Sequence, residues 1–218
     1  RVSKSDSNVL IMGETGTGKE LIAHSIHSNS NRRNKPFVIQ NCAAIPSTIM
    51  ESILFGTSKG SFTGAIDKEG LFESANGGTI CLDEINSIPY DLQSKLLRAL
   101  ENKSVMRIGE NIEREIDIRI IASANEDLAK KVEHGEFRAD LFYRLNVISF
   151  RVPPLRERKD DIKVLVDYYI NHYNSILNKN ILGISKEAMK VLKNYEWKGN
   201  VRELKNVIEY ALNFSEEE

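Results

Sequence analysis

The sequence Val9-Leu10-Ile11-Met12-Gly13-Glu14-Thr15-Gly16-Thr17-Gly18-Lys19-Glu20 decides the fold. A short apolar run typical of a buried strand leads into a glycine-rich loop, after which apolar residues return at helical spacing. A glycine-rich loop between a strand and a helix is the usual setting of a phosphate-binding loop. Its backbone N–H groups face phosphate oxygens, the helix N-terminus adds partial positive charge, and Lys19 offers a point charge to the β- and γ-phosphates. We therefore expect the segment Gly13 to Glu20 to bind a nucleoside triphosphate. The alternative is a glycine-rich turn with a surface lysine.

Short apolar runs of a buried strand's length recur along the first part of the chain, and segments that read as helix separate them. The runs are Phe37 to Ile39, Thr79 to Leu82, Ile118 to Ala122 and Val147 to Phe150. With the first run they predict an α/β fold, in which helices flank a five-stranded, mainly parallel sheet.

The pattern changes after Pro153-Pro154, because proline cannot continue a central strand. Three helices are predicted beyond it, from Ile162 to Leu177, Ser185 to Tyr195 and Val201 to Phe214. We expect an α/β nucleotide-binding subdomain in residues 1–155 and a small all-helical lid in residues 156–218.

Composition excludes several classes of protein. The 218 residues are 41% hydrophobic and 28% charged, with no apolar run long enough to cross a membrane and no secretory signal. A cytoplasmic location is expected. A net charge of -1 provides no general attraction to a nucleic-acid backbone, so we expect DNA to be contacted mainly by a domain absent from this chain. The abrupt end after a helical pattern also suggests a longer protein. Cys42 and Cys81 are expected to be reduced and buried.

The run Thr79 to Leu82 ends in two acids, Asp83 and Glu84. A carboxylate at the carboxyl end of a strand beside a phosphate loop is well placed to orient magnesium, and we assign this role to Asp83. Glu84 is then the general base that polarises the attacking water. An acidic pair in this position can also be a helix cap or a solvated turn. Glu20, in turn, stands where Ser or Thr usually holds magnesium.

Three polar residues further along the chain are candidates for the same site. Asn125 follows the fourth apolar run, where its amide can sense the γ-phosphate or hold the water, or can cap a helix starting at Glu126. Arg138 and Arg144 lie six residues apart, so on one helix they need separate partners. Each is a candidate to stabilise the transferring phosphoryl group of a neighbouring subunit, or a partner in a surface salt bridge.

The segment Gly60-Ser61-Phe62-Thr63-Gly64-Ala65 resembles the GAFTGA signature of the sigma-54 interaction domain. This domain belongs to bacterial enhancer-binding proteins of the NtrC type, a branch of the AAA+ P-loop NTPases. Further blocks are similar to those of the same family and stand in the same order: Glu51 to Gly56, Gly70 to Ala75, Phe137 to Leu145, Pro153 to Arg158 and Gly199 to Leu204. The resemblance covers almost the whole chain and includes the unusual Glu20, which is common in the family.

This resemblance implies an ATPase that uses Mg²⁺ and assembles into a hexameric ring. Lys19, Asp83 and Glu84 act within one subunit, whereas Arg144, and with it Arg138, reach across from the next.

The resemblance also implies roles for three further parts of the chain. Arg202 matches the second sensor on the lid, and Asn41 matches an asparagine that holds the catalytic glutamate in check. Hydrolysis moves the loop carrying Phe62 and Thr63, which contacts sigma-54 in the RNA polymerase holoenzyme and opens the closed promoter complex. Glycines at both ends of this loop allow hinge-like backbone angles.

Two residues depart from the family pattern. Ser61 replaces the first alanine of the signature, a small-for-small change, and Ala124 stands where threonine is usual, so a hydroxyl is missing from the first sensor.

A second loop, Asn102 to Asp117, is expected to support the first. Two other functions stay open: a AAA+ machine acting on another protein or on nucleic acid, and a nucleotide-dependent scaffold that does not hydrolyse ATP.

Overall fold

The computed structural model describes residues 2–61 and 63–215. The chain divides into two compact units, Arg1–Met12 with Lys19–Arg151, and Gly13–Gly18 with Val152–Glu218. The glycine-rich loop therefore groups with the C-terminal helices, although it lies between the first strand and the first helix of the other unit.

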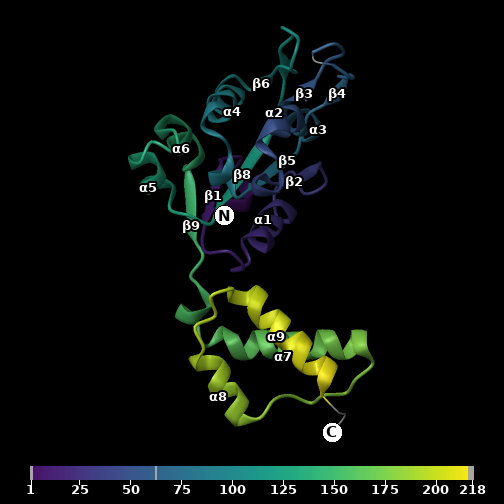
Figure 1. The fold of residues 1–218 in the computed structure, drawn as a ribbon, viewed down its shortest axis with the longest axis vertical. Coiled ribbons are helices and arrows are strands. Elements are labelled where there is room, and N and C mark those ends of the chain that lie inside the picture. Colours follow the sequence, from purple (N-terminus) through teal and green to yellow (C-terminus); the bar gives the residue numbers. More distant parts are fainter. Residues whose placement is uncertain (1, 62, 216–218) are drawn as a thin grey trace. The chain divides into compact units, whose positions relative to one another are not determined.

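The first unit is built on a five-stranded sheet in the order β2-β5-β8-β1-β9, and every neighbouring pair is parallel (Figure 1). Its strands are β1 (Val9–Met12), β2 (Phe37–Asn41), β5 (Thr79–Asp83), β8 (Arg119–Ala124) and β9 (Ile148–Arg151). The five-stranded parallel sheet predicted from the apolar runs is confirmed. Because all strands run the same way, the polar residues at or next to the carboxyl ends of β2, β5 and β8 lie at one edge of the sheet.

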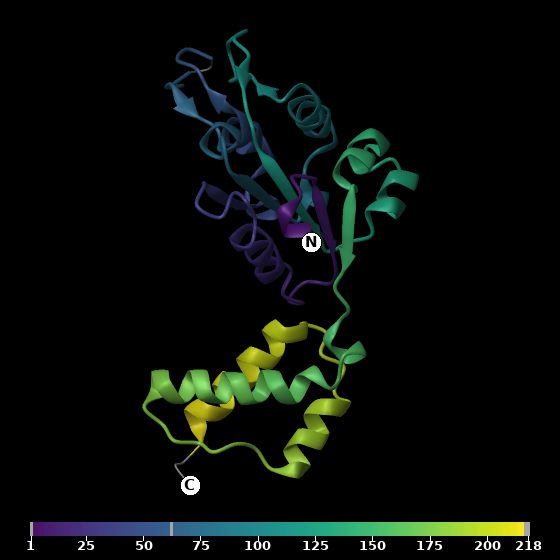
Figure 2. The same cartoon turned by 180° about the vertical axis from the view of Figure 1, so that it is seen from behind.

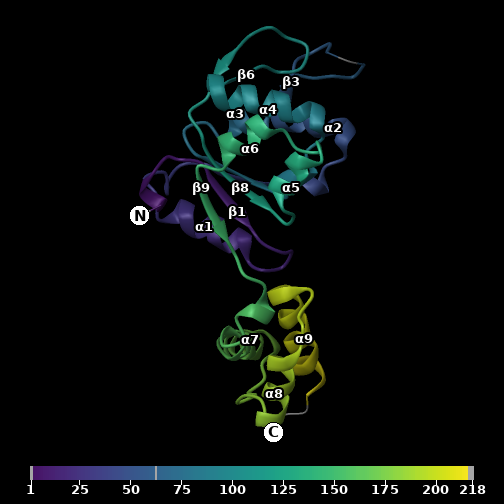
Figure 3. The same cartoon turned by 90° about the vertical axis from the view of Figure 1, so that its left-hand side faces the viewer.

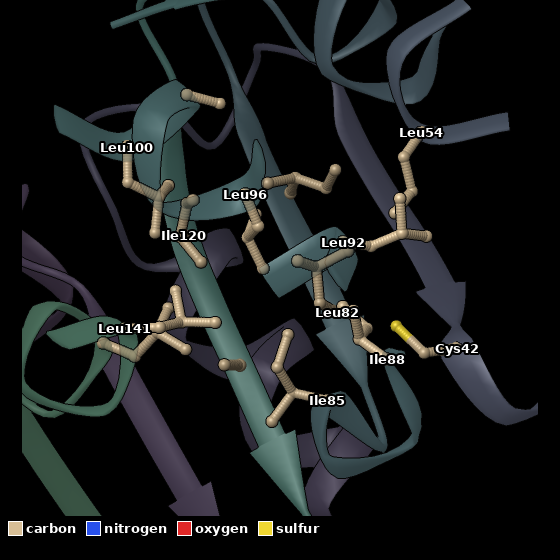
Figure 4. Packing of buried hydrophobic residues seen from close by; sticks show 14 of the residues in the cluster. Cys42, Leu54, Leu82, Ile85, Ile88, Leu92, Leu96, Leu100, Ile120 and Leu141 are labelled. Carbon is tan, nitrogen blue, oxygen red and sulfur yellow. The ribbon is translucent and has the colours of Figure 1, made fainter. Parts of the chain in front are cut away.

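Helices cover both faces of this sheet, with α1 on one face and α4 and α6 on the other (Figure 3). The helices of the unit are α1 (Lys19–Ser28), α2 (Ser47–Phe55), α3 (Leu71–Ser74), α4 (Tyr90–Asn102), α5 (Leu128–Glu133) and α6 (Ala139–Leu145). Leu92, Leu96 and Leu100 recur every four residues, so they form one apolar stripe on α4. Figure 4 shows this stripe packed over Leu82 and Ile120 of the sheet.

Two short hairpins project from the same end of this unit (Figure 2). One joins β3 (Gly56–Thr57) to β4 (Lys68–Glu69), and the other joins β6 (Ser104–Val105) to β7 (Arg114–Glu115), both antiparallel. They contain the two loops that the sequence singled out.

The helices of the second unit are α7 (Asp161–Leu177), α8 (Lys186–Asn194) and α9 (Asn200–Phe214). Ile162, Val166 and Ile170 on α7 and Leu204 and Ile208 on α9 repeat at four-residue intervals, and both stripes are buried in one core. The all-helical fold predicted for this part is confirmed.

Both cysteines are buried free thiols, as predicted. Burial, with a smaller contribution from the charge of Asp83, raises the pKa of the Cys42 thiol to about 12. The same two causes raise the pKa of Cys81 to about 12. Thiols that stay protonated at neutral pH are poor nucleophiles and metal ligands, which leaves packing as their role. Within residues 2–61 and 63–215, no helix is both long enough and apolar enough to cross a membrane.

Candidate functional site

The predicted phosphate-binding loop has two positions at which the backbone favours glycine. Gly16 and Gly18 have φ angles of 80° and 100°, in the left-handed region. A Cβ atom added to Gly16 would lie 2.4 Å from the carbonyl oxygen of Gly199. Gly16 is thus required both by its conformation and by the close approach of the lid backbone.

Lys19 and Glu20 open α1. The Lys19 side chain is held inside the fold, since the residue is only 7% exposed, and a helix N-terminus is a favourable place for a phosphate group. Glu20 is exposed and lies 3.9 Å from His24 one turn later, so its carboxylate is directed along the helix surface.

Side chains of the helical unit bind the loop from the lid side. Arg156 donates to both carboxylate oxygens of Glu14 at 2.8 and 2.5 Å. Asn200 donates to Glu14 at 3.2 Å and to the carbonyl oxygen of Thr15 at 3.0 Å. Arg158 donates to the carbonyl oxygen of Thr17 at 2.8 Å. The loop and the lid are therefore one hydrogen-bonded structure.

The first turn of α9 completes this connection. The backbone N–H groups of Val201 and Arg202 donate to the carbonyl oxygen of Gly16 at 3.0 and 3.3 Å. Such N–H groups have no partner within their own helix, so the loop caps α9. Arg202 also lines a cavity of about 580 Å³ together with Thr15 and Tyr210. This places the predicted second sensor beside the phosphate loop.

Asp83 is the last residue of β5, and neighbouring strands hold both of its carboxylate oxygens. The Asn41 amide at the end of β2 donates to Oδ2 at 3.3 Å. The Ser123 hydroxyl on β8 donates to Oδ1. Asn41 was expected to hold Glu84, but the bond that the structure shows is to Asp83.

Glu84 has a left-handed backbone, with φ 53° and ψ 49°, and precedes the 3-10 turn Ile85–Ser87. Side chains rarely adopt this conformation, and such strain is frequent at active sites. This conformation turns the chain sharply directly after β5, so the side chains of Asp83 and Glu84 point in different directions.

Asn125 follows β8 directly, and its backbone N–H donates to Asn86 at 3.4 Å. The alternative that Asn125 caps the next helix is wrong. Helix α5 begins at Leu128, and its cap is Asp127, whose carboxylate accepts from the N–H groups of Ala129 and Lys130.

Arg138 and Arg144 have separate partners, as their spacing predicts. Arg138 precedes α6 and donates to both oxygens of Asp140, at 3.1 and 2.7 Å. This hydrogen bond holds the pKa of Asp140 below its usual range. The exposed Arg144 donates to the carbonyl oxygen of Leu100 at 2.9 Å. The salt-bridge alternative thus describes a contact of Arg138, whereas the contact of the Arg144 guanidinium is with a backbone carbonyl.

The predicted partner loop, residues 60–65, lies between β3 and β4. Gly60 and Gly64 both have φ of 84°, with open space around them, and Thr63 is exposed. Phe62 lies outside the described residues. The Ser61 hydroxyl is buried and has no hydrogen-bond partner within the described part of the chain.

The second loop supports the first, as the sequence predicts. The Ser58 N–H donates to the Ile108 carbonyl and the Ile108 N–H to the Gly56 carbonyl, each at 3.0 Å. Arg107 anchors this second hairpin through bonds of 2.8 and 2.7 Å to Glu73 on α3. Hydrogen bonding from Arg107 holds the pKa of Glu73 below its usual range, so this ion pair persists in mildly acidic solution.

Sequence reasoning missed four side chains at this site: Asn200, Arg156, Arg158 and Ser123. The first three lie in segments that resemble the family, but this resemblance does not show which residues their side chains contact. Ser123 is adjacent to the conspicuous Ala124, and only strand alternation could have directed attention to it.

Comparisons with known proteins place the chain in one family. Residues 1–151 match the family model of the sigma-54 interaction domain, and residues 156–218 match that of the AAA+ ATPase lid domain. The transcriptional activator RocR of Bacillus subtilis is 50% identical over 218 residues, which are 100% of this chain and 47% of RocR. The regulatory protein AtoC of Escherichia coli is 50% identical over 97% of this chain and 46% of its own length.

Among solved structures, NtrX from Brucella abortus in complex with ADP has a TM-score of 0.90 and 39% identity. The match covers 96% of this chain and 46% of NtrX. The structure of NtrX in complex with ATP has a TM-score of 0.89. This chain spans about half the length of RocR, AtoC and NtrX. With a phosphate loop, a parallel sheet, a helical lid and two matching family models, the chain belongs to the sigma-54 interaction domain family of AAA+ proteins.

Proposed function

We propose that this chain is the ATP-hydrolysing motor of a sigma-54-dependent transcription activator, which converts the closed promoter complex of RNA polymerase into the open one. One observation carries the proposal. The tip of the first hairpin presents Thr63 to solvent between two left-handed glycines and is braced by a second hairpin, in a chain that also has a phosphate loop. The names of the relatives and the ADP and ATP complexes of NtrX support it.

In this proposal ATP is bound by Gly13, Glu14, Thr15, Gly16, Thr17, Gly18, Lys19 and Glu20. Within the described residues, no cluster of three His, Cys, Asp or Glu side chains could hold a metal alone. A single carboxylate fits Mg²⁺ that arrives with the nucleotide, because this ion keeps several waters and binds phosphates. Asp83 would hold the ion, which when bound neutralises charge on the phosphate oxygens.

The roles nearest the reacting atoms go to two residues at the sheet edge. Glu84 accepts a proton from the attacking water, and Asn125 positions that water or senses the γ-phosphate. Asn41 acts on this pair through Asp83, to which its amide is bonded.

Three arginines complete the proposed site. Arg202 contacts the nucleotide from the lid, and Arg144, with Arg138 beside it, acts on the nucleotide of the next subunit in a ring, as a hexamer. An arginine supplied in this way is worth about 10³ to 10⁵ in rate. Arg144 is the better candidate, because its guanidinium donates to a backbone carbonyl, whereas Arg138 must first leave the carboxylate of Asp140.

Hydrolysis is coupled to movement of the loop Gly60, Ser61, Phe62, Thr63, Gly64 and Ala65, which contacts sigma-54. Residues 1–155 act as the nucleotide-binding subdomain and residues 156–218 as its lid. DNA is contacted mainly by a further domain of the protein, and an activator of RNA polymerase works in the cytoplasm.

The test is co-elution of the protein with purified sigma-54 without nucleotide, with ADP, and with ADP and aluminium fluoride, which imitates the transferring phosphoryl group. We expect a complex only with the mimic. The variant Thr63→Ala should lose this complex and keep ATPase activity, whereas Thr48→Ala, which alters an exposed threonine on α2, should keep both.

Three results would contradict the proposal. Full transcription activation by Thr63→Ala would show that the loop is not the contact with sigma-54. No complex from a preparation that forms rings and hydrolyses ATP would favour a AAA+ machine acting on a different target. If no ATP turnover that depends on Glu84 is measured, the result would favour a nucleotide-dependent scaffold that does not hydrolyse ATP.

A further inference from the structure

We propose that Ser123 is a positioning residue that orients the Asp83 carboxylate for its magnesium ion. This inference rests on the proposed function only in taking Asp83 as the residue that holds Mg²⁺. The roles proposed for the phosphate loop and for the acidic pair do not include a role for Ser123.

Ser123 lies opposite Asp83 in the sheet. In the register of β5 and β8, Cys81 is paired with Ile121 and Leu82 with Ala122. One further step along both strands brings Asp83 opposite Ser123, on the same face. The serine hydroxyl therefore reaches the carboxylate directly across two neighbouring strands.

The Ser123 hydroxyl and the Asp83 carboxylate are in direct contact. Ser123 is only 2% exposed, and its hydroxyl donates to Oδ1 of Asp83. The Asn41 amide on the other side of β5 donates to Oδ2 at 3.3 Å. Two donors from opposite sides prevent the carboxylate from rotating, and outer groups of this kind determine how a first ligand meets its metal.

The neighbouring residue, Ala124, is in the wrong position to supply this hydroxyl. Successive side chains of a strand point to opposite faces, so Ala124 points away from Asp83. Ala124 is fully buried in the apolar core beneath α4. A hydroxyl that bonds Asp83 from the end of β8 must therefore come from residue 123.

The experiment measures Mg²⁺ binding apart from turnover. Affinity for a fluorescent ADP analogue is determined in EDTA and at increasing Mg²⁺ in the whole chain, for wild type and Ser123→Ala. We expect equal affinity in EDTA and about a tenfold increase in the Mg²⁺ concentration that gives half of the metal-dependent gain. At saturating Mg²⁺, kcat should recover. Ser123→Thr, which keeps the hydroxyl, should behave as wild type.

Ser94→Ala on α4 is the matched control, since the hydroxyl it removes donates to the Asp91 carbonyl of its own helix. If Ser123→Ala unfolds early in a thermal melt, Ser123→Cys, with similar volume and a weaker donor, replaces it and should show a smaller shift in the same direction. An unchanged Mg²⁺ titration, or an equal loss of affinity in EDTA, overturns the proposal.

Asp83→Asn separates this inference from the proposed function. If that variant abolishes the effect of Mg²⁺ and Ser123→Ala does not change it, only the positioning role is wrong. If Asp83→Asn also leaves the Mg²⁺ titration unchanged, the magnesium role of Asp83 fails, and the inference fails with it.

Discussion

At Glu84, the backbone and the side chain have conflicting requirements. The left-handed φ of 53° is favourable for glycine and unfavourable for glutamate, yet the proposed reaction needs a carboxylate here. An acid retained at such a cost is better explained by a role in hydrolysis than by a role in folding.

Glu84→Gly should therefore be more stable than Glu84→Ala by about 1 kcal/mol, since both lack the carboxylate but only glycine relieves the strained backbone. Neither variant should hydrolyse ATP. Urea unfolding and a phosphate-release assay measure the two effects. Equal stability of the two variants would show that the backbone at residue 84 is not strained in solution.

Ser61 provides a second conflict between local chemistry and packing. Its hydroxyl is buried without a hydrogen-bond partner in the described residues, whereas the hydroxyl of nearby Ser58 donates to the Ile108 carbonyl at 2.9 Å. Loss of hydration without a compensating bond is unfavourable.

We expect Ser61→Ala to raise the free energy of unfolding by about 1 kcal/mol, because it removes an unsatisfied hydroxyl. Ser58→Ala should lower it, because the Ile108 carbonyl loses a partner. Thermal melts of the two variants and the wild type measure this difference. A destabilised Ser61→Ala would mean that water or a partner satisfies the hydroxyl.

Individual residues also show where the sequence is a sufficient guide. Glycines such as Gly16 could be assigned from the chain alone, because a local backbone requirement selects them. The partner of Asn41 could not, since the sequence alone does not distinguish Asp83 from Glu84, and the register of β2 and β5 places Asn41 opposite Asp83.

At the scale of elements, Asn200 joins three parts of the helical unit. Its side chain accepts from the Leu155 N–H at 2.8 Å and donates to Glu14 and to the Thr15 carbonyl. Asn200 is fully buried and has φ of 55°, a conformation that asparagine tolerates better than most residues.

Asn200→Gly keeps this backbone and removes all three bonds, so we expect it to cost about 1–3 kcal/mol and to weaken ADP binding. Asn213→Ala, which removes an exposed asparagine from the same helix, is the control. Urea unfolding and ADP titration test both. An Asn200→Gly variant as stable as the control would show that the loop does not depend on this side chain.

Elements with strong periodicity were predictable, and very short ones were not. The stripe of leucines on α4 and the apolar runs of the sheet are long enough to give a clear pattern. Strands β3, β4, β6 and β7 have two residues each, too few for any period, so the hairpins were located only through the resemblance of residues 60–65.

At the scale of the whole molecule, the roles proposed for Glu84 and Arg144 belong to different subunits. Mixing Glu84→Gln with Arg144→Ala subunits should therefore restore part of the ATPase activity that each inactive variant lacks alone. Mixed rings contain interfaces at which an intact Glu84 faces an intact Arg144. A coupled ATPase assay across mixing ratios measures this, and two Glu84 variants mixed together are the control. No recovery in rings shown to be mixed would place Arg144 within its own subunit's site.

The grouping of the phosphate loop with the lid was not predictable from the order of elements along the chain. Glu14 and Arg156 are 142 residues apart, and no local pattern indicates that they meet. The sequence predicts the sheet and the helical unit separately, because each is encoded by its own periodicity.

This grouping has a consequence for the exchange of modules between relatives. A chimaera cut near residue 155 divides the chain at its linear boundary, yet separates Glu14 from Arg156 and Gly16 from the first turn of α9. The six loop residues and the helices form one compact unit, although residues 19–151 separate them along the chain. A lid transplanted from another member of the family should be accompanied by that member's own glycine-rich loop.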